Sequence, residues 1–496
     1  MKNIKLIEIL SLILAAFVLL SSCGKKDDSD LRWGFTTEPR TLNPLNPANS
    51  ADGRSILFNV FEGLVKPNTD GTFAPCIAES WTIEQGGLVY NFILREGILF
   101  HDGSALTASD IKFSLDTAIA ANYAGLNNIK ETLILDNNKI SVILKTADPE
   151  FLPYLTIGIV KEEITDHEIN IIGTGPFIIE SYTPQRNLVL KKFDNYWQPG
   201  LPNLDKITIV FFANFDTLMV ALRGGSIDGA FITGAMAAQL DHREFDIFNN
   251  RSAAIQLLAL NNAKGALEDI RVRKAINHGV DIKGIINTAF FGHGSPSGSP
   301  VIPGLRENFK DNLSYPHNIE LAQSYLNQAG YNDTNRLSLE ITVPSNFTMH
   351  VDTAQVIASQ LDQIGIKTSI KLVDWDTWLE DVYTNMNYEA TIISLDSPIV
   401  SARSFLTRYL SDNRNNFINY KNPDFDRVYN LALTETDREK RINLYKDAQI
   451  IITEDAASVF IQDILYFIAL SGGKYAGALD YPLYVIDLSS IYRISK

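Results

Sequence analysis

The segment from residue 337 to 373 has the order strand, helix, strand, and this order constrains the fold more than any other feature of the chain. Leu337–Val343 and Ile366–Val373 are apolar runs typical of strands, and the second alternates clearly. Between them, Asp352–Ile364 has helical apolar spacing and ends at Gly365. Strands joined by a helix rather than a hairpin run parallel, with a right-handed crossover. The segment therefore predicts an α/β domain with a largely parallel sheet.

The same domain contains a candidate ligand-binding position. Trp375–Tyr383 has helical spacing, and Ala390–Leu395 is a short apolar strand followed at once by Asp396. In open α/β sheets, ligands bind beyond the carboxyl ends of the strands. A carboxylate at that place suits an ammonium group. The alternative is that Asp396 caps a turn or a helix, which is a common role for aspartate.

An earlier part of the chain, roughly residues 51–171, has the pattern of a small α/β layer of its own. Residues 88–95 alternate between apolar positions and positions of mixed character, as a strand does. Thr107 and Asp110 have the spacing of a capping box and predict the start of a helix. Thr132–Leu135 and Ile140–Leu144 flank a short polar turn and predict a β-hairpin.

The pattern changes at the glycine-rich segment Gly173–Pro176. Leu188–Phe193 and Ile207–Phe212 are expected to be strands. Asp216–Arg223 is expected to be a helix that ends at a pair of glycines, residues 224 and 225.

The N-terminus has the features of an export signal. Lys2 and Lys5 precede the apolar run Ile9–Leu20, and two serines then lead to Cys23. This arrangement resembles a lipobox, in which Cys23 receives a lipid after residues 1–22 are removed. Residues 23–30 are mostly polar and predict a flexible tether. The alternative is a transmembrane anchor, but the apolar run is shorter than the roughly 20 residues that span a bilayer.

Composition narrows the range of partners and cofactors. A net charge of −15 argues against binding to nucleic acid or anionic lipid. The apolar content of 45% supports folded cores. Only Cys76 accompanies Cys23, so no intrachain disulfide is expected in the processed chain, and Cys76 is expected to be buried.

Motifs for catalysis or metal binding do not emerge from the sequence. The seven histidines contain no pair with the spacing of a zinc helix motif. His101–Gly103 predicts a turn, and Gly292–Gly298 predicts a rigid loop rather than a phosphate loop. We therefore predict no metal site, no cofactor and no enzymatic activity.

Several strings, in order along the chain, resemble one family, the peptide/nickel-type extracytoplasmic solute-binding proteins that serve ABC importers. Each string alone is weak, whereas their shared order is specific and covers essentially the whole chain after Cys23. The strings are Thr37–Pro44, Ala78–Trp81, Tyr90–Arg95, Phe100–Gly103, Leu106–Ile111, Gly173–Phe177, Tyr196–Trp197, Arg271–Ile276, Asn419–Tyr420 and Asn422–Asp426.

The resemblance implies a two-lobed α/β fold of the periplasmic-binding-protein type with an additional small α/β domain. Lobe one would combine residues 31–50, 172–255 and 470–496, the small domain would be 51–171, and lobe two would be 256–469. It further implies a monomer outside the cytoplasm, anchored to the cell membrane by its lipid, that delivers a ligand to permease subunits. Most family members bind peptides, and others bind nickel chelates, haem or sugars.

The resemblance also implies ligand-binding residues. Peptide-binding members hold the ligand's α-ammonium group with an Asp four residues after the Gly of a Gly-Trp pair. Ile392 and Ile393 replace that pair here, and the spacing then assigns Asp396 to the Asp, with Ser394 and Leu395 beside it. Residues 381–390 lack the basic side chains that some members have. The matching segment of the opposite wall adds Glu38 and Pro39 as candidates.

Overall fold

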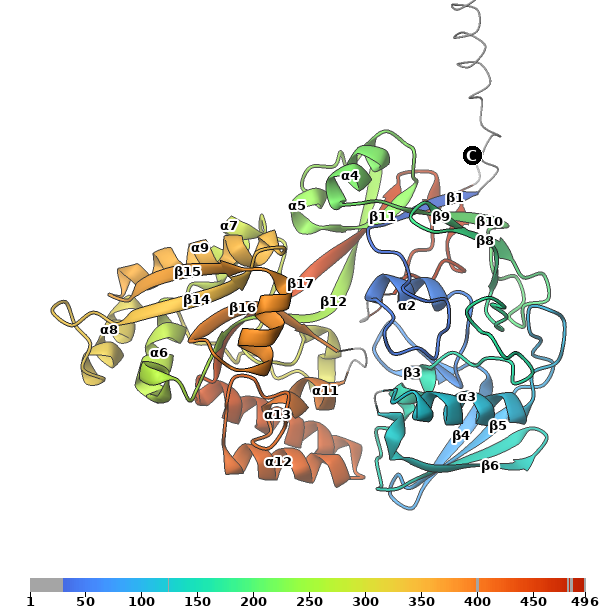
Figure 1. Ribbon diagram of the computed structural model, residues 1–496, viewed down its shortest axis with the longest axis horizontal. Helices are drawn as coiled ribbons and strands as arrows, with labels where there is room; N and C mark the ends of the chain where they lie inside the picture. Colours follow the sequence, from blue (N-terminus) through green and yellow to red (C-terminus); the bar gives the residue numbers. More distant parts are fainter. Residues whose placement is uncertain (1–29, 124, 398–400, 480, 482–484, 495–496) are drawn as a thin grey trace, which may run out of the picture.

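The protein has two lobes joined by one continuous β-sheet (Figure 1). The structure, a computed structural model, describes residues 30–123, 125–397, 401–479, 481 and 485–494. Eleven strands of this described part form the sheet, and two long strands, β12 (Phe245–Leu260) and β17 (Ser458–Ser471), pair along most of their length and run from one lobe into the other. The predicted signal peptide and Cys23 lie outside the described residues.

The first lobe is built around β1 (Leu31–Phe35), which lies parallel to both of its neighbours. The buried ring of Trp33 packs edge-on against Phe231, with ring centroids 5.8 Å apart. The predicted strands and helix after residue 172 are confirmed. The elements of this lobe are β8 (Phe177–Thr183), β9 (Asn187–Lys192), β10 (Lys206–Phe211), α4 (Phe215–Arg223), β11 (Gly229–Thr233), α5 (Gly234–Ala237), β18 (Tyr475–Ala476) and β19 (Tyr492–Arg493).

The second lobe confirms the predicted strand–helix–strand unit. Strand β14 (Ser338–Pro344) pairs in parallel with β15 (Lys367–Val373), and α9 (Thr348–Gln363) connects them. Strand β16 (Ala390–Asp396) adds a third parallel strand. The expectation of a largely parallel sheet is wrong beyond these three, because β12 and β17 are antiparallel to their neighbours as they enter from the other lobe.

Helices cover the sheet of the second lobe, and the predicted helix over Trp375–Tyr383 continues as a π-helix. The remaining elements of this lobe are η3 (Gly265–Glu268), α6 (Ile270–Gly279), α7 (Ile282–Ala289), β13 (Ser295–Pro296), η4 (Pro303–Asn308), α8 (Ile319–Gln328), α10 (Trp375–Thr377), η5 (Trp378–Thr384), α11 (Ala402–Leu406), η6 (Thr407–Tyr409), α12 (Pro423–Thr434) and α13 (Arg438–Glu454).

A separate antiparallel sheet forms a four-stranded unit beside the first lobe (Figure 1). Its strands lie in the order β4 (Ala78–Glu84), β5 (Val89–Leu94), β7 (Lys139–Leu144) and β6 (Ile129–Asp136). Its helix α3 (Ala108–Ala120) begins at Thr107 with both hydrogen bonds of the predicted capping box to Asp110. The predicted hairpin is also confirmed. The elements of this region are α2 (Ala51–Leu57), β2 (Val65–Pro67), β3 (Phe73–Pro75), β4 (Ala78–Glu84), β5 (Val89–Leu94), η1 (Leu126–Asn128), β6 (Ile129–Asp136), β7 (Lys139–Leu144) and η2 (Leu152–Thr156).

The glycine-rich segment 173–176 packs closely on the chain that follows α2. A Cβ atom on Gly173 would lie only 2.0 Å from the carbonyl oxygen of Val60, so a larger residue does not fit there. His101 joins the same contact, because its Nδ1 accepts from the amide of Gly173 and its Nε2 lies 3.0 Å from the carbonyl oxygen of Gly175. In the described part of the chain, no helix combines the length and apolarity needed to cross a bilayer.

Candidate functional site between the lobes

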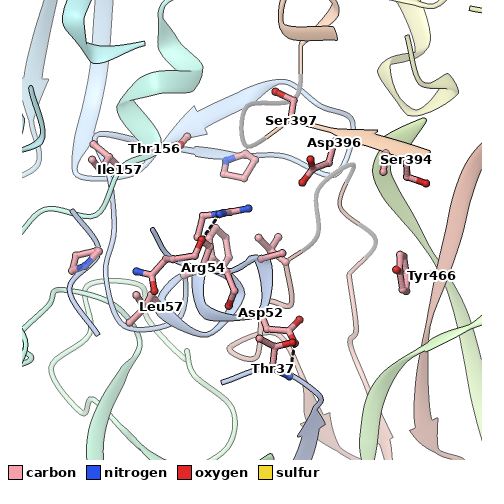
Figure 2. A pocket seen from close by; sticks show the side chains of 18 of the residues that line it. Thr37, Asp52, Arg54, Leu57, Thr156, Ile157, Ser394, Asp396, Ser397 and Tyr466 are labelled. Carbon is pink, nitrogen blue, oxygen red and sulfur yellow. Dashed lines mark hydrogen bonds between the residues drawn. The ribbon is translucent and has the colours of Figure 1, made fainter. Parts of the chain in front are cut away.

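A cavity of about 640 Å³ lies between the lobes. Helix α2 and the segments around residues 36–37 and 153–158 form one wall, and the end of β16 with residues Phe347, His350 and Trp375 forms the other. Tyr466 on the long strand β17 also lines it (Figure 2). The volume falls in the range of roughly 300–1,000 Å³ that is usual for small-ligand sites.

Asp396 is the last residue of β16 and extends into this cavity (Figure 2). Pairing with Ala254 on β12 fixes its backbone, and the guanidinium group of Arg408 donates to its carbonyl oxygen. Its side chain is exposed. The N-cap of the following helix α11 is Ser401, so Asp396 is not the N-cap of that helix. The alternative role of Asp396 in a turn concerns residues 398–400, which lie outside the described residues.

The neighbouring candidates Ser394 and Leu395 lie on opposite faces of the same strand, because side chains alternate along a strand. Ser394 lines the cavity, and its buried Oγ makes no hydrogen bond to the described residues. Leu395 points away and is buried in the hydrophobic core of the second lobe. The residue Ser394 therefore borders the cavity, although its Oγ is covered, whereas the side chain of Leu395 does not border it.

Glu38 and Pro39 are not among the described residues that line the cavity. The carboxylate of Glu38 accepts from the hydroxyl of Tyr182 at 2.9 Å and from the amide of Gln185 at 2.7 Å. Pro39 is buried behind α2, where its Cα would lie 3.1 Å from a Cβ atom on Gly53. Both residues thus support the wall from outside rather than facing a ligand.

Sequence reasoning missed a second carboxylate in the cavity. Asp52 in the first turn of α2 is 6% exposed and accepts from the amide of Thr37 at 3.0 Å. Burial raises the pKa of Tyr466 to about 12, and the negative charges of Asp52 and Asp396 add to this rise. Two acidic groups from opposite walls therefore act on one region, which favours a positively charged ligand group.

The wall of the second lobe adds an aromatic surface that the sequence analysis also missed. Trp375 stacks on Trp378 with ring centroids 5.1 Å apart and meets Phe347 edge-on at 5.4 Å. Burial lowers the pKa of His350 to about 4, and its Nδ1 accepts from the side-chain amide of Gln256 at 3.1 Å. His350 is therefore neutral at pH 7 and adds no positive charge to the cavity.

Outside the cavity, an interlobe ion-pair cluster joins the four-stranded unit to the second lobe. We use this name for Asp148, Glu150, Arg403, Arg441 and Tyr445. Asp148 pairs with Arg403, Glu150 accepts from the Tyr445 hydroxyl, and Arg441 Nε lies 3.6 Å from Glu150. The side chain of Asp148 is 4% exposed and that of Arg403 is 24% exposed. These contacts link the four-stranded unit directly to the second lobe.

The family of the chain follows from a match over residues 72–417 to the bacterial extracellular solute-binding proteins, family 5. This stretch is more than half of the chain and includes β16 and the wall that carries Asp396. The chain belongs to this family. An interlobe cavity lined by polar and aromatic side chains is accordingly the site expected in a solute-binding protein.

Individual proteins resemble this family 5 protein in sequence or in fold. Heme-binding protein A of Haemophilus influenzae is 25% identical, with 93% of both chains covered. The glutathione-binding protein GsiB of Escherichia coli is 27% identical, with 84% of this chain and 85% of the relative covered. The substrate-binding protein CtaP of Listeria monocytogenes shares the fold with a TM-score of 0.83 at 22% identity, over 94% of this chain and 99% of CtaP.

Proposed function

We propose that this family 5 protein is a lipid-anchored, substrate-binding component of an ABC importer that captures oligopeptides in the interlobe cavity. The observation that carries the proposal is the Asp396 carboxylate at the end of β16, which extends into the cavity between the lobes. A buried ammonium group needs a charged partner, because an unpaired charge is costly to bury. Asp396 supplies it through a charge-assisted hydrogen bond.

The rest of the cavity suits an extended peptide. Main-chain groups of a peptide can bond to the strand end at β16, where Ser394 and Asp396 line the cavity. Such bonds do not depend on the peptide's side chains, so selectivity can be broad. Leu395, Glu38 and Pro39 then shape the site indirectly, by packing and hydrogen bonding behind the lining residues.

Closure of the lobes over the ligand requires a hinge. We assign lobe one to residues 31–50, 172–255 and 470–496, the small domain to 51–171, and lobe two to 256–469. The borders near 255 and 470 then fall within β12 and near the end of β17, the two strands that pass between the lobes. Closure is a hinge motion whose equilibrium the ligand shifts.

Delivery to a membrane permease requires that the protein stay at the membrane. We infer that Cys23 carries a lipid and that residues 23–30 tether a monomeric body outside the cytoplasm. Metabolic labelling with a radioactive fatty acid tests this inference. Label on the wild type and none on Cys23→Ala supports the anchor, and an unlabelled wild type refutes it.

Calorimetry of the purified protein with a peptide library tests the peptide assignment. Micromolar binding by one or more peptides supports it. Haem is the second candidate, since a relative with 93% coverage is named a heme-binding protein. Binding of haem without binding of any peptide would replace the peptide assignment.

The neighbouring genes test the coupling to transport. Genes for a permease and an ATPase beside the gene for this protein would favour an importer, and their absence would favour a surface receptor.

A further inference from the structure

The cavity contains one positive group as well as its two carboxylates. Arg54 is the only arginine or lysine among the described residues that line it. The side chain extends from α2, which begins at the N-cap Ser50, and Nη1 donates to the carbonyl oxygen of Asn49 at 2.7 Å. This bond occupies only one of the five N–H donors of the guanidinium group.

Arg54 has no ion pair with a carboxylate in the described part of the chain. Asp52, two positions earlier on α2, instead accepts from the amide of Thr37. Figure 2 shows the guanidinium group of Arg54 in the middle of the view, between α2 and the wall that carries Asp396. A half-buried guanidinium group with free donors in a ligand cavity is suited to bind an anion.

No other described side chain that lines the cavity offers a positive charge to an anion at pH 7. The segment 381–390, which leads into β16, contains no lysine or arginine. His350 on the opposite wall is neutral at pH 7. Burial raises the pKa of Tyr123, and the nearby positive charge of Arg54 opposes this rise, so its charge acts within the same cavity.

We propose that Arg54 binds a carboxylate of the ligand, so that the ligand is a short zwitterion whose ammonium and carboxylate groups are both enclosed between α2 and the end of β16. The inference rests on the proposed function, and it narrows the ligand from oligopeptides in general to short peptides with a free C-terminus. A guanidinium group binds a carboxylate through two parallel hydrogen bonds, which also fix the orientation of the ligand.

Calorimetry with paired ligands tests this proposal. The probes are a pool of tripeptides with free carboxyl ends and the same pool as C-terminal amides. We expect the wild type to bind the free acids roughly 10- to 100-fold more tightly, as for hydrogen bonds to charged groups. Arg54→Gln should bind both pools alike, and Arg54→Lys should keep part of the preference.

Arg223→Gln is the matched control, because Arg223 lies on α4 and does not line the cavity. It should keep the wild-type preference. Equal binding of acids and amides by the wild type would overturn the role of Arg54 and leave peptide binding intact. The same follows if Arg54→Gln retains the preference. If neither pool binds but longer peptides of the library do, the Arg54 proposal fails and the peptide function stands. If no peptide of any length binds, both fail. Because the first comparison uses only the wild type, it does not depend on the folding of a variant.

Discussion

Removing Arg403 from the interlobe ion-pair cluster should open the lobes. In Arg403→Met the carboxylate of Asp148, whose side chain is 4% exposed, would lose its charged partner. Breaking a buried pair costs about 3–5 kcal/mol, whereas exposed pairs contribute about 0.2–1 kcal/mol. Because Arg403 is 24% exposed, we expect the loss of this pair to cost about 2–4 kcal/mol, which lies between the two ranges and closer to that of buried pairs. This corresponds to a shift of roughly 30- to 900-fold between closed and open forms.

Small-angle X-ray scattering of the unliganded protein measures this shift as a larger radius of gyration. Calorimetry should show weaker ligand binding, because part of the binding energy then goes into closure. The control is Arg438→Met, whose pair with Glu307 lies within the second lobe and is exposed on both sides. Wild-type scattering and affinity in Arg403→Met would refute the role of the cluster.

The other predictions concern stability. Burial lowers the pKa of His101 and of His350 to about 4, so unfolding takes up protons below pH 6.5. The free energy of unfolding should therefore fall by about 3 kcal/mol per histidine as the pH drops from 6.5 to 4. Urea titrations at several pH values measure this fall, and it should be smaller in His350→Asn. Burial raises the pKa of Glu62, whose carboxylate accepts from Tyr196 and Trp197. Glu62→Gln should lower the free energy of unfolding by about 1–3 kcal/mol, because one donor then faces an amide N–H, while the exposed Glu84→Gln should not.

Local sequence patterns were sufficient to predict several of the individual elements. The capping box at Thr107 and the strand–helix–strand unit from residue 337 depend on residues close together in the chain, so spacing alone identifies them. The position of Asp396 at the end of a strand was predictable for the same reason. Side chains alternate along a strand, so Leu395 points away from the cavity that Ser394 and Asp396 line. The prediction of residues 394–396 as one site neglected this alternation.

The residues of the opposite wall of the cavity could not be predicted from the sequence, because their position depends on long-range packing. Asp52 and Arg54 lie on a seven-residue helix whose sequence does not indicate that it faces β16, more than 300 residues away. The extension of β12 and β17 through both lobes likewise follows from pairing between strands about 200 residues apart. Glu38 was assigned from the family segment, but its hydrogen bonds to Tyr182 and Gln185 hold it outside the cavity.

The most direct test of the central claim compares one bound peptide with its N-acetylated form in the wild type and in Asp396→Asn. Acetylation removes the positive charge of the ligand and adds a small acetyl group. The substitution removes the negative charge of the protein and preserves the shape of the side chain. We predict that acetylation weakens wild-type binding by about 2–5 kcal/mol in calorimetry and changes the binding of Asp396→Asn far less. Equal wild-type affinity for the free and acetylated peptides would contradict an ammonium group held at the end of β16.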